Sequence, residues 1–304
     1  MNKRTLFCTG LLLFAGATLA SAEGPPIGDT PWRWTGQAGM LFQSETSLDT
    51  GGDMQVNRFF VEGGGSRMLA GGWRLGVSLG YGEDDYDFSG STGFGGLDPW
   101  GRIRDLRVSA PIQYALNDGW TLYGIPSLRF NAESGASLGD GQTAGLLAGA
   151  AYRVSERLTI GPGLGVFSEL EDDASIFPIL IIDWKITDSL SLETGRGFAA
   201  SRGPGLQLRW TYSPSWQFAL GGRYENIRFR LDDDGVAPGG VGEDTAVPLF
   251  ALAEFAFSPD AKFSIFGGVE VGGSLRLEDE SGQRVSKSDL SSAPFFGGSF
   301  QANF

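Results

Sequence analysis

The 304-residue sequence contains no histidine and a single cysteine, Cys8. Histidine is the side chain that most readily acts as a general base near neutral pH, so its absence argues against an enzyme, although a carboxylate pair could still act. One cysteine excludes an internal disulfide and a cysteine-rich metal site. We therefore expect no enzymatic activity, no cofactor and no metal.

Beyond the N-terminus, the sequence has no apolar run long enough for a membrane-spanning helix. The N-terminus itself reads "MNKR", then the apolar "LFCTGLLLFAGATLA", then "SAEG". This order is typical of a cleaved signal peptide, and a membrane anchor is the less favoured alternative because the run is short and small residues follow it. We predict a signal peptide over residues 1–22 and one domain over 23–304, exported to the bacterial outer membrane.

Basic residues are scarce, with 23 Lys and Arg against 36 Asp and Glu. Removal of Lys3 and Arg4 with the signal leaves 21 against 36, a charge of −15. Such an acidic chain is not expected to bind nucleic acid.

Short turns alternate with longer polar stretches along the rest of the chain. Five segments place an aromatic residue just before a tight turn and restart a strand after it: "YALNDGWTL" (114–122), "YRVSERLTI" (152–160), "WKITDSLSL" (184–192), "WTYSPSWQF" (210–218) and "FAFSPDAKF" (255–263); "RMLAGGWRL" (67–75) is a looser sixth. Six turns and seven longer loops, among them "SELEDDA" (168–174), predict about 14 strands, with 12 as the alternative. Short turns on one side and long loops on the other are typical of a transmembrane β-barrel.

The strands show a period of two. In 261–277, Phe263, Ile265 and Val269 fall on the face that we expect to point outward, together with Leu275 and Leu277, and Glu270 and Arg276 fall on the other. A soluble β-sandwich also explains alternation, but not the aromatic residues before each turn, which match a girdle at the membrane surface. The predicted fold is all-β: a transmembrane antiparallel up-and-down barrel with both termini periplasmic.

The last segment, "SAPFFGGSFQANF" (292–304), keeps an apolar face to its final residue. In this respect the chain resembles bacterial outer-membrane barrels, whose last strand commonly ends in an aromatic residue that the barrel-assembly machinery reads. The resemblance implies that Phe300 and Phe304 are an assembly signal.

Three further segments resemble an uncharacterised family of bacterial outer-membrane barrel domains. They are "GPGLGVFSELEDDASIFPILIIDWKITDSLSLETG" (161–195), "YENIRFRLDDDGVAPGGVGED" (224–244) and "GGSLRLEDESG" (272–282), and the likeness covers roughly residues 100–304. It implies the barrel and the outer membrane and brings no established activity.

Charged residues on the inward phase are the candidate pore lining. We predict that Arg107, Arg129, Arg209, Arg223, Arg276 and Glu270 line the lumen, where charged side chains set ion selectivity. The alternative is that the arginines pair with acids on neighbouring strands and only fill the interior.

One strand is apolar on both faces. In "SIFPILIIDW" (175–184), Phe177, Ile179 and Ile181 fall inward and Pro178 interrupts the strand. A second apolar face indicates that something packs on it, such as a hydrophobic solute, and Pro178 indicates a missing ladder bond where the wall could open sideways.

The functional expectation is a channel or transporter that passes small solutes, either mildly anion-favouring or hydrophobic. The alternative is a structural or surface-interaction barrel without an open pore, whose acidic loops contact lipopolysaccharide, cations or a partner. Expected partners are outer-membrane lipid, lipopolysaccharide, the assembly machinery and small solutes.

Overall fold

The computed structural model describes residues 29–116, 119–195 and 203–304. The signal peptide predicted over 1–22 lies outside these residues. Within them, no helix has the length and apolar character needed to cross a membrane.

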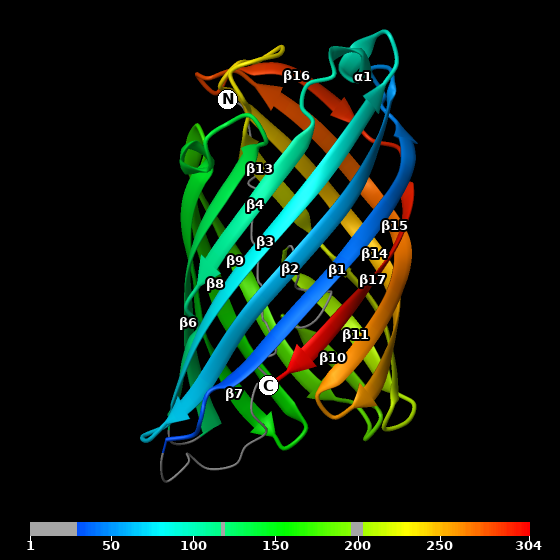
Figure 1. Ribbon diagram of the computed structural model, residues 1–304. Coiled ribbons are helices and arrows are strands. Elements are labelled where there is room, and N and C mark those ends of the chain that lie inside the picture. The colour runs from blue at the N-terminus through cyan, green and yellow to red at the C-terminus, as the bar shows by residue number, and fades with distance from the viewer. Residues whose placement is uncertain (1–28, 117–118, 196–202) are drawn as a thin grey trace.

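In the described residues, seventeen strand segments form one closed sheet, antiparallel except where β13 meets β6, and this sheet is a tall barrel whose strands run obliquely around its axis (Figure 1). The first seven are β1 (Arg33–Ser47), β2 (Asp53–Leu69), β3 (Trp73–Ser89), β4 (Arg102–Ser109), β5 (Ile112–Ala115), β6 (Trp120–Glu133) and β7 (Gln142–Ser155). The other ten are β8 (Leu158–Glu169), β9 (Asp172–Lys185), β10 (Leu190–Thr194), β11 (Gly205–Thr211), β12 (Trp216–Arg223), β13 (Glu225–Arg230), β14 (Val241–Ser258), β15 (Ala261–Glu278), β16 (Arg284–Asp289) and β17 (Ala293–Asn303). A short helix α1 (Gly93–Leu97) and a 3-10 turn η2 (Leu138–Gly141) lie in loops.

The segments make 14 strands, as the turn pattern predicted. Three strands are each split in two, β4 with β5, β12 with β13 and β16 with β17, so the 17 segments reduce by three to 14. Pro111 lies in the first interruption. A proline has no N–H to donate to the neighbouring strand, so the pairing breaks there. The barrel closes where β1 pairs with β17, from Thr35 with Asn303 to Gln43 with Phe295.

The barrel has two different ends. The short turns after β2, β5, β7, β9, β11 and β14 lie at one end, which we call the turn end; β1 begins there and β17 ends there (Figure 1). The opposite, loop end carries α1. One of its connections is shorter than the sequence suggested: β8 and β9 are joined by Leu170 and Glu171 alone, so the segment expected as a longer loop at 168–174 is a tight turn.

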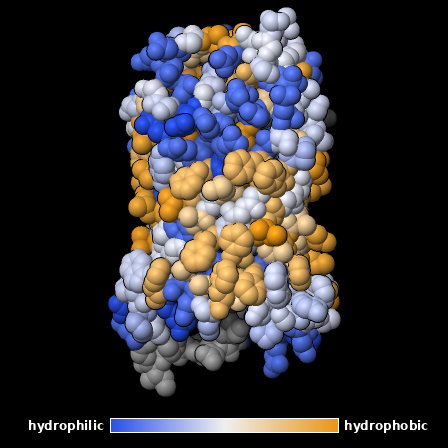
Figure 2. Space-filling view, turned by 45° about the vertical axis from the view of Figure 1, so that its right-hand side comes forward, coloured by the Kyte–Doolittle hydropathy of each residue, from blue (hydrophilic) through white to orange (hydrophobic). Residues whose placement is uncertain are grey.

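Apolar side chains form a band around the outside. Figure 2 shows this band across the middle of the face in view, with hydrophilic residues above and below it. At the turn end, aromatic rings pair across neighbouring strands, with centroids 4.5 Å apart for Trp73 and Tyr114 and 5.0 Å for Trp120 and Tyr152. The outer face therefore has the apolar belt and aromatic girdle of a membrane barrel.

Inside the wall, aromatic rings lie over glycines directly opposite them on the neighbouring strand. Phe177 is paired with Gly165, and a side chain at Gly165 would collide with its ring. The other pairs of this kind are Phe60 with Gly39, Tyr123 with Gly149, Phe167 with Gly145, Phe250 with Gly221 and Phe266 with Gly297. The inward aromatic residues thus lie close against the wall rather than projecting across the lumen.

Candidate functional site: a pocket through the barrel wall

The loop end is narrower than the turn end because β13 changes neighbours. Its continuation β12 lies between β11 and β14, but β13 pairs with β14 and, in parallel, with β6 through Arg230 and Ala132. The Asn131 side chain also donates to the Arg228 carbonyl at 3.2 Å. At this level β1, β2, β3, β4, β6, β13, β14, β15 and β16 form a ring that leaves out β7 to β11.

This smaller ring encloses an apolar core. Phe229 is fully buried beside Trp100, with ring centroids 5.1 Å apart, and Phe94 of α1 closes the core from above. The whole cluster is Leu48, Met54, Val56, Tyr86, Phe94, Trp100, Ile103, Ile227, Phe229, Leu231, Ala237, Leu275 and Leu277. A packed core of this kind fills the loop end of the lumen.

A loop at the same end is held by hydrogen bonds between distant segments. Asp49, between β1 and β2, accepts from the Ser288 hydroxyl at 2.7 Å and from the Asp289 N–H at 2.9 Å. These two bonds, with Ser288 the larger cause, lower the pKa of the Asp49 carboxyl.

Below the apolar core lies a layer of buried charges centred on Arg58. Its guanidinium is 2.9 Å from Glu270, 3.2 Å from Asp244, 3.5 Å from Glu225 and 3.9 Å from Asp84. Arg223 pairs with Glu225, and the Tyr86 hydroxyl donates to Asp244 at 2.7 Å. The predicted lumen residue Glu270 therefore belongs to a closed network rather than to an open lining.

The predicted lumen arginines are engaged with neighbours. Arg107 is 2.7 Å from Asp105, and Arg209 is 2.7 Å from Glu193. Arg129 is buried with its guanidinium 5.3 Å from the centre of the Phe167 ring, and Arg223 pairs with Glu225 as described. Arg107, Arg209 and Arg223 thus meet acids on neighbouring positions of the wall, as in the pairing alternative.

Arg276 does not lie where the alternation predicted. The pairing of β14 with β15 shifts register between Thr245 and Val247, next to Gly272, whose φ is +62°. An extra residue in one strand reverses the faces of everything beyond it. Leu275 and Leu277 therefore point into the apolar core, and Arg276 lies on the opposite face, 3.3 Å from Glu243 and 3.2 Å from Glu278.

The apolar inward residues of β9 meet others inside the barrel. Phe177 and Phe167 stack with centroids 6.0 Å apart, and Ile125, Leu147 and Ile179 complete this cluster. Ile181 lies next along the inner face. Ile176 and Leu180, on the other face of β9, are 53% and 54% exposed, so the strand is apolar towards both sides of the wall.

Among the residues that the structure describes, the wall is incomplete beside β9. The next strands, β10 and β11, are five and seven residues long, against 14 for β9. In the described residues β10 pairs with β9 only at Lys185, Trp184 and Asp183, and the Thr194 side chain then caps Ile182 by accepting from its N–H at 2.9 Å. Trp184 belongs to the aromatic girdle, and the pairing of β9 with β10 ends just beyond it. The end of this pairing therefore lies inside the apolar band.

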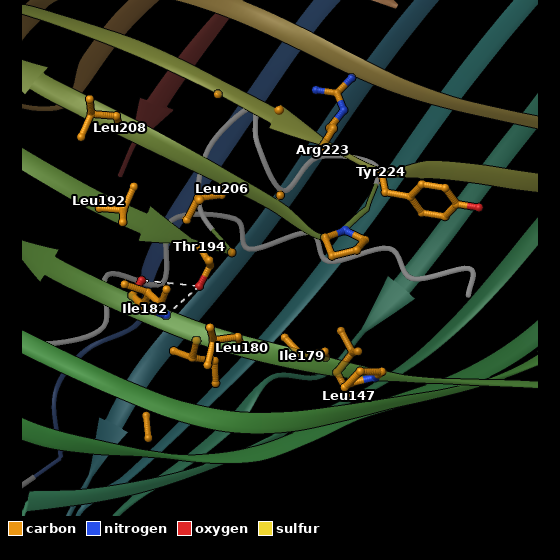
Figure 3. A pocket seen from close by; sticks show the side chains of 18 of the residues that line it. Leu147, Ile179, Leu180, Ile182, Leu192, Thr194, Leu206, Leu208, Arg223 and Tyr224 are labelled. Atoms are coloured by element: carbon orange, nitrogen blue, oxygen red, sulfur yellow. Dashed lines mark hydrogen bonds between the residues drawn. The ribbon is translucent and has the colours of Figure 1, made fainter. Parts of the chain in front are cut away.

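A pocket of about 750 Å³ occupies this place, and we call it the wall pocket (Figure 3). Its lining includes side chains from the outer face, namely Leu180, Ile182, Leu192, Leu206, Leu208, Leu220 and Leu249. It also includes inner-face residues, namely Gln113, Thr121, Tyr123, Leu147, Ile179, Ile181 and Arg223. The pocket therefore passes from the outer surface of the barrel to its lumen.

The tip of the β8–β9 hairpin borders the gap at the loop end. Arg228 donates to the Leu170 carbonyl at 2.7 Å and lies 3.9 Å from Glu169, and Arg230 lies 2.6 Å from Glu171. These arginines are on the face of β13 opposite Ile227 and Phe229. One side of β13 thus packs on the apolar core, and the other holds the hairpin tip.

The alternation of the sequence places Arg58 on the inward phase, but it does not show the network of carboxylates around this residue. Pro178, where a sideways opening was expected, lines the wall pocket, but the sequence does not show that pocket or β13 as a unit. The signal for β13 is present in "ENIRFR" (225–230), where apolar and arginine residues alternate and nearly all are buried. The described residues include no group of acidic, histidine or cysteine side chains that could hold a metal ion.

Comparison with known proteins gives matches only among solved structures. Neither family models nor curated protein sequences match the chain. An outer-membrane channel from Pseudomonas putida F1 is 12% identical, with a TM-score of 0.48 and coverage of 93% of this chain and 97% of the other.

Two further structures are similar. A Pseudomonas aeruginosa FadL homologue is 11% identical, with a TM-score of 0.46 and coverage of 90% and 89%. The Pseudomonas putida toluene transporter TodX is 12% identical, with a TM-score of 0.44 and coverage of 98% and 96%. These neighbours are outer-membrane β-barrels, which is the fold of this chain; at such identities and scores no function follows from them.

Proposed function

We propose that the chain is an outer-membrane channel in which small apolar solutes pass between the lumen and the surrounding bilayer through the wall pocket. The observation that carries the proposal is the lining of that pocket by both faces of the wall. A side chain such as Leu180 faces lipid, and Ile181, its neighbour in sequence, faces the lumen. A solute in the pocket is in contact with both compartments.

The size and chemistry of the pocket support a small, largely apolar solute. Its volume of about 750 Å³ is in the range that ligand sites of folded proteins use. Leucine and isoleucine dominate the lining, with a few polar groups such as Gln113, Thr121 and the Tyr123 hydroxyl on the lumen side. Polar groups placed on one side orient an amphipathic molecule with its polar end inward.

A straight ion-conducting pore is less well supported. The arginines that could favour anions are paired with carboxylates, as Arg107 is with Asp105 and Arg209 with Glu193. The apolar core also fills the loop end of the lumen. The same core supports the second candidate, a structural barrel that passes nothing.

Widened side chains at the lip of the pocket test the proposal. Leu180→Trp with Leu206→Trp should fill the outer mouth and reduce binding of an apolar fluorescent probe, 1-N-phenylnaphthylamine, to the refolded protein in detergent. Leu79→Trp is the matched control, because Leu79 is an outward-facing leucine, 54% exposed, that does not line the pocket. Equal binding by the wild-type chain, the double variant and the control would favour the structural barrel.

The orientation in the membrane is part of the proposal. Short turns are periplasmic in outer-membrane barrels and long loops are extracellular, so the turn end with both chain ends of the described barrel would face the periplasm. A tag inserted at 233–242 should be accessible on intact cells, and one at 259–260 should not. Labelling of the second site on intact cells would reverse the orientation.

Phe300 and Phe304 are proposed as the signal read by the assembly machinery. Phe304 is 80% exposed at the end of the closing strand, so it can be replaced without disturbing a core. Phe304→Asp should reduce barrel assembly while export across the inner membrane continues. Normal amounts of folded barrel in the outer membrane would remove this role from Phe304.

Lipid, including lipopolysaccharide, is the proposed surrounding of the barrel. No catalytic role is proposed, since the histidine-free chain lacks the usual general base for neutral pH.

A further inference from the structure

We infer that the wall pocket communicates with the turn-end half of the lumen alone, so that solutes are exchanged between the bilayer and the periplasm and do not cross the loop end. This inference rests on the proposed function and adds its sidedness. Four features of the barrel support it: the ring closed by β13, the core packed inside that ring, the charge layer below the core, and the polar lining of the other half.

The ring closed by β13 separates the loop end from the wall pocket. Arg230 pairs with Ala132 of β6, which brings strands 98 residues apart side by side. The inner face of β13 then belongs to the loop-end ring, and its outer face looks towards β8 and β9. β13 is thus a partition between the two spaces.

The space inside the ring is filled. Phe229 is fully buried on the inner face of β13, and Leu275 and Leu277, on the next strand but one, belong to the same buried cluster. A close-packed interior of this kind has no voids for a solute larger than water. A passage through it would require the core to come apart.

The charge layer below the core is a second barrier. Arg58 meets four carboxylates there, and its side chain is 4% exposed. An apolar solute that moved through this layer would have to displace ion pairs without replacing their contacts, which is costly in a buried setting.

The turn-end half has the opposite character. All 14 strands enclose it, and its inward side chains include Gln113, Thr121, Glu193, Arg209 and Gln217. Interior width grows with the number of strands, and polar inward residues are those of a water-filled lumen. The wall pocket reaches this half through Gln113, Thr121 and Tyr123.

The test measures extraction of a lipophilic probe from each side of a membrane. Proteoliposomes that carry the barrel in one orientation, established by protease cleavage of a site inserted at 233–242, are loaded with 1-dodecylpyrene. Methyl-β-cyclodextrin, which does not cross the bilayer, is present either outside or inside as the acceptor. Loss of pyrene excimer fluorescence reports the rate of transfer.

We expect transfer to be several-fold faster than in protein-free liposomes when the acceptor is on the turn-end side, and unchanged when it is on the loop-end side. Leu180→Trp with Leu206→Trp should abolish the acceleration, and Leu79→Trp should retain it. Acceleration from the loop-end side would overturn the sidedness but leave the proposed function standing. No acceleration from either side would reject the proposed function itself.

A disulfide across the partition provides an independent test of whether the loop-end ring opens. Ala132→Cys with Arg230→Cys joins β6 to β13 at directly paired positions, and the only native cysteine, Cys8, lies in the predicted signal peptide. Oxidised and reduced samples of the same protein are compared, so that loss of the Arg230 side chain affects both equally. Transfer should be the same in both; a fall on oxidation, restored by reductant, would show that the loop-end ring opens during transfer and would overturn the inference.

Discussion

The two halves of this barrel differ in the number of strands around them and in what those strands enclose. At the loop end, β13 shortens the circumference and the enclosed space becomes a packed core around Phe229 and Trp100. At the turn end, all the strands remain in the wall, and the interior is lined by polar and paired charged groups. The difference shows that a change of partner by a single strand decides whether a barrel of this size encloses a core or a lumen.

The largest effect should come from the layer between the two halves. Arg58→Ala would leave Asp84, Glu225, Asp244 and Glu270 close together without their shared cation. Removal of one partner from a buried ion pair costs about 3–5 kcal/mol, and we expect a loss of this order in the free energy of unfolding, measured by urea titration of the refolded barrel. Arg102→Ala, which breaks a pair at the surface with Asp85, should cost less than about 1 kcal/mol. Equal losses in the two variants would contradict the buried network.

The second prediction concerns the packed core that distinguishes the loop end from the turn end. Phe229→Ala should leave a cavity in the loop-end core and cost about 3 kcal/mol in the free energy of unfolding. The weakened core should also admit water, so planar-bilayer recordings should show current steps that the wild-type chain lacks. Phe257→Ala is the control, because Phe257 is 60% exposed on the outer face. Current steps of the same size in the wild-type chain would show that the loop end is already open.

The alternation of short turns and longer loops was enough to predict 14 strands, and the aromatic residues before the turns were enough to predict the girdle. The sequence pattern could not predict the loop-end ring, because a period of two shows which residues share a face but not which strand lies alongside. A bulge beside Gly272 also reversed the faces of Leu275, Arg276 and Leu277, and one inserted residue leaves almost no trace in the sequence. The wall pocket exists because β10 and β11 are short. The turn residues do not show where the pairing between two strands ends, so this pocket could not be predicted from them.

A third prediction concerns the glycines over which aromatic rings of the neighbouring strand lie. Gly165→Val should force the Phe177 ring off the wall and cost about 1–3 kcal/mol, since overpacking displaces well-packed neighbours. Gly124→Val is the matched control: Gly124 also lies in a strand, and nothing is within 4 Å of the position that its side chain would take. Urea titration of both variants compares them. A loss no greater for Gly165→Val than for Gly124→Val would show that the ring can move freely.

The smallest effect is expected at the turn end. Arg209→Ser in the Phe229→Ala background should remove the cation next to Glu193 and move the reversal potential slightly towards cation selectivity. The shift should shrink as salt rises, because screening shortens the range of the freed charge. Arg157→Ser, at a surface pair with Asp188, is the control and should leave the potential unchanged. A shift towards anions would mean that Arg209 is not the group that neutralises Glu193.

The rings that rest on glycines have a consequence for the bore of the barrel. Each pair, such as Phe177 with Gly165, places an aromatic ring directly opposite a residue that has no side chain. The combined side-chain volume of the pair is therefore that of one ring. The free width of the lumen therefore depends on the sum across a pair and not on either residue. Exchange of the two members, Phe177→Gly together with Gly165→Phe, should leave that width nearly unchanged, whereas either single change would open or obstruct it.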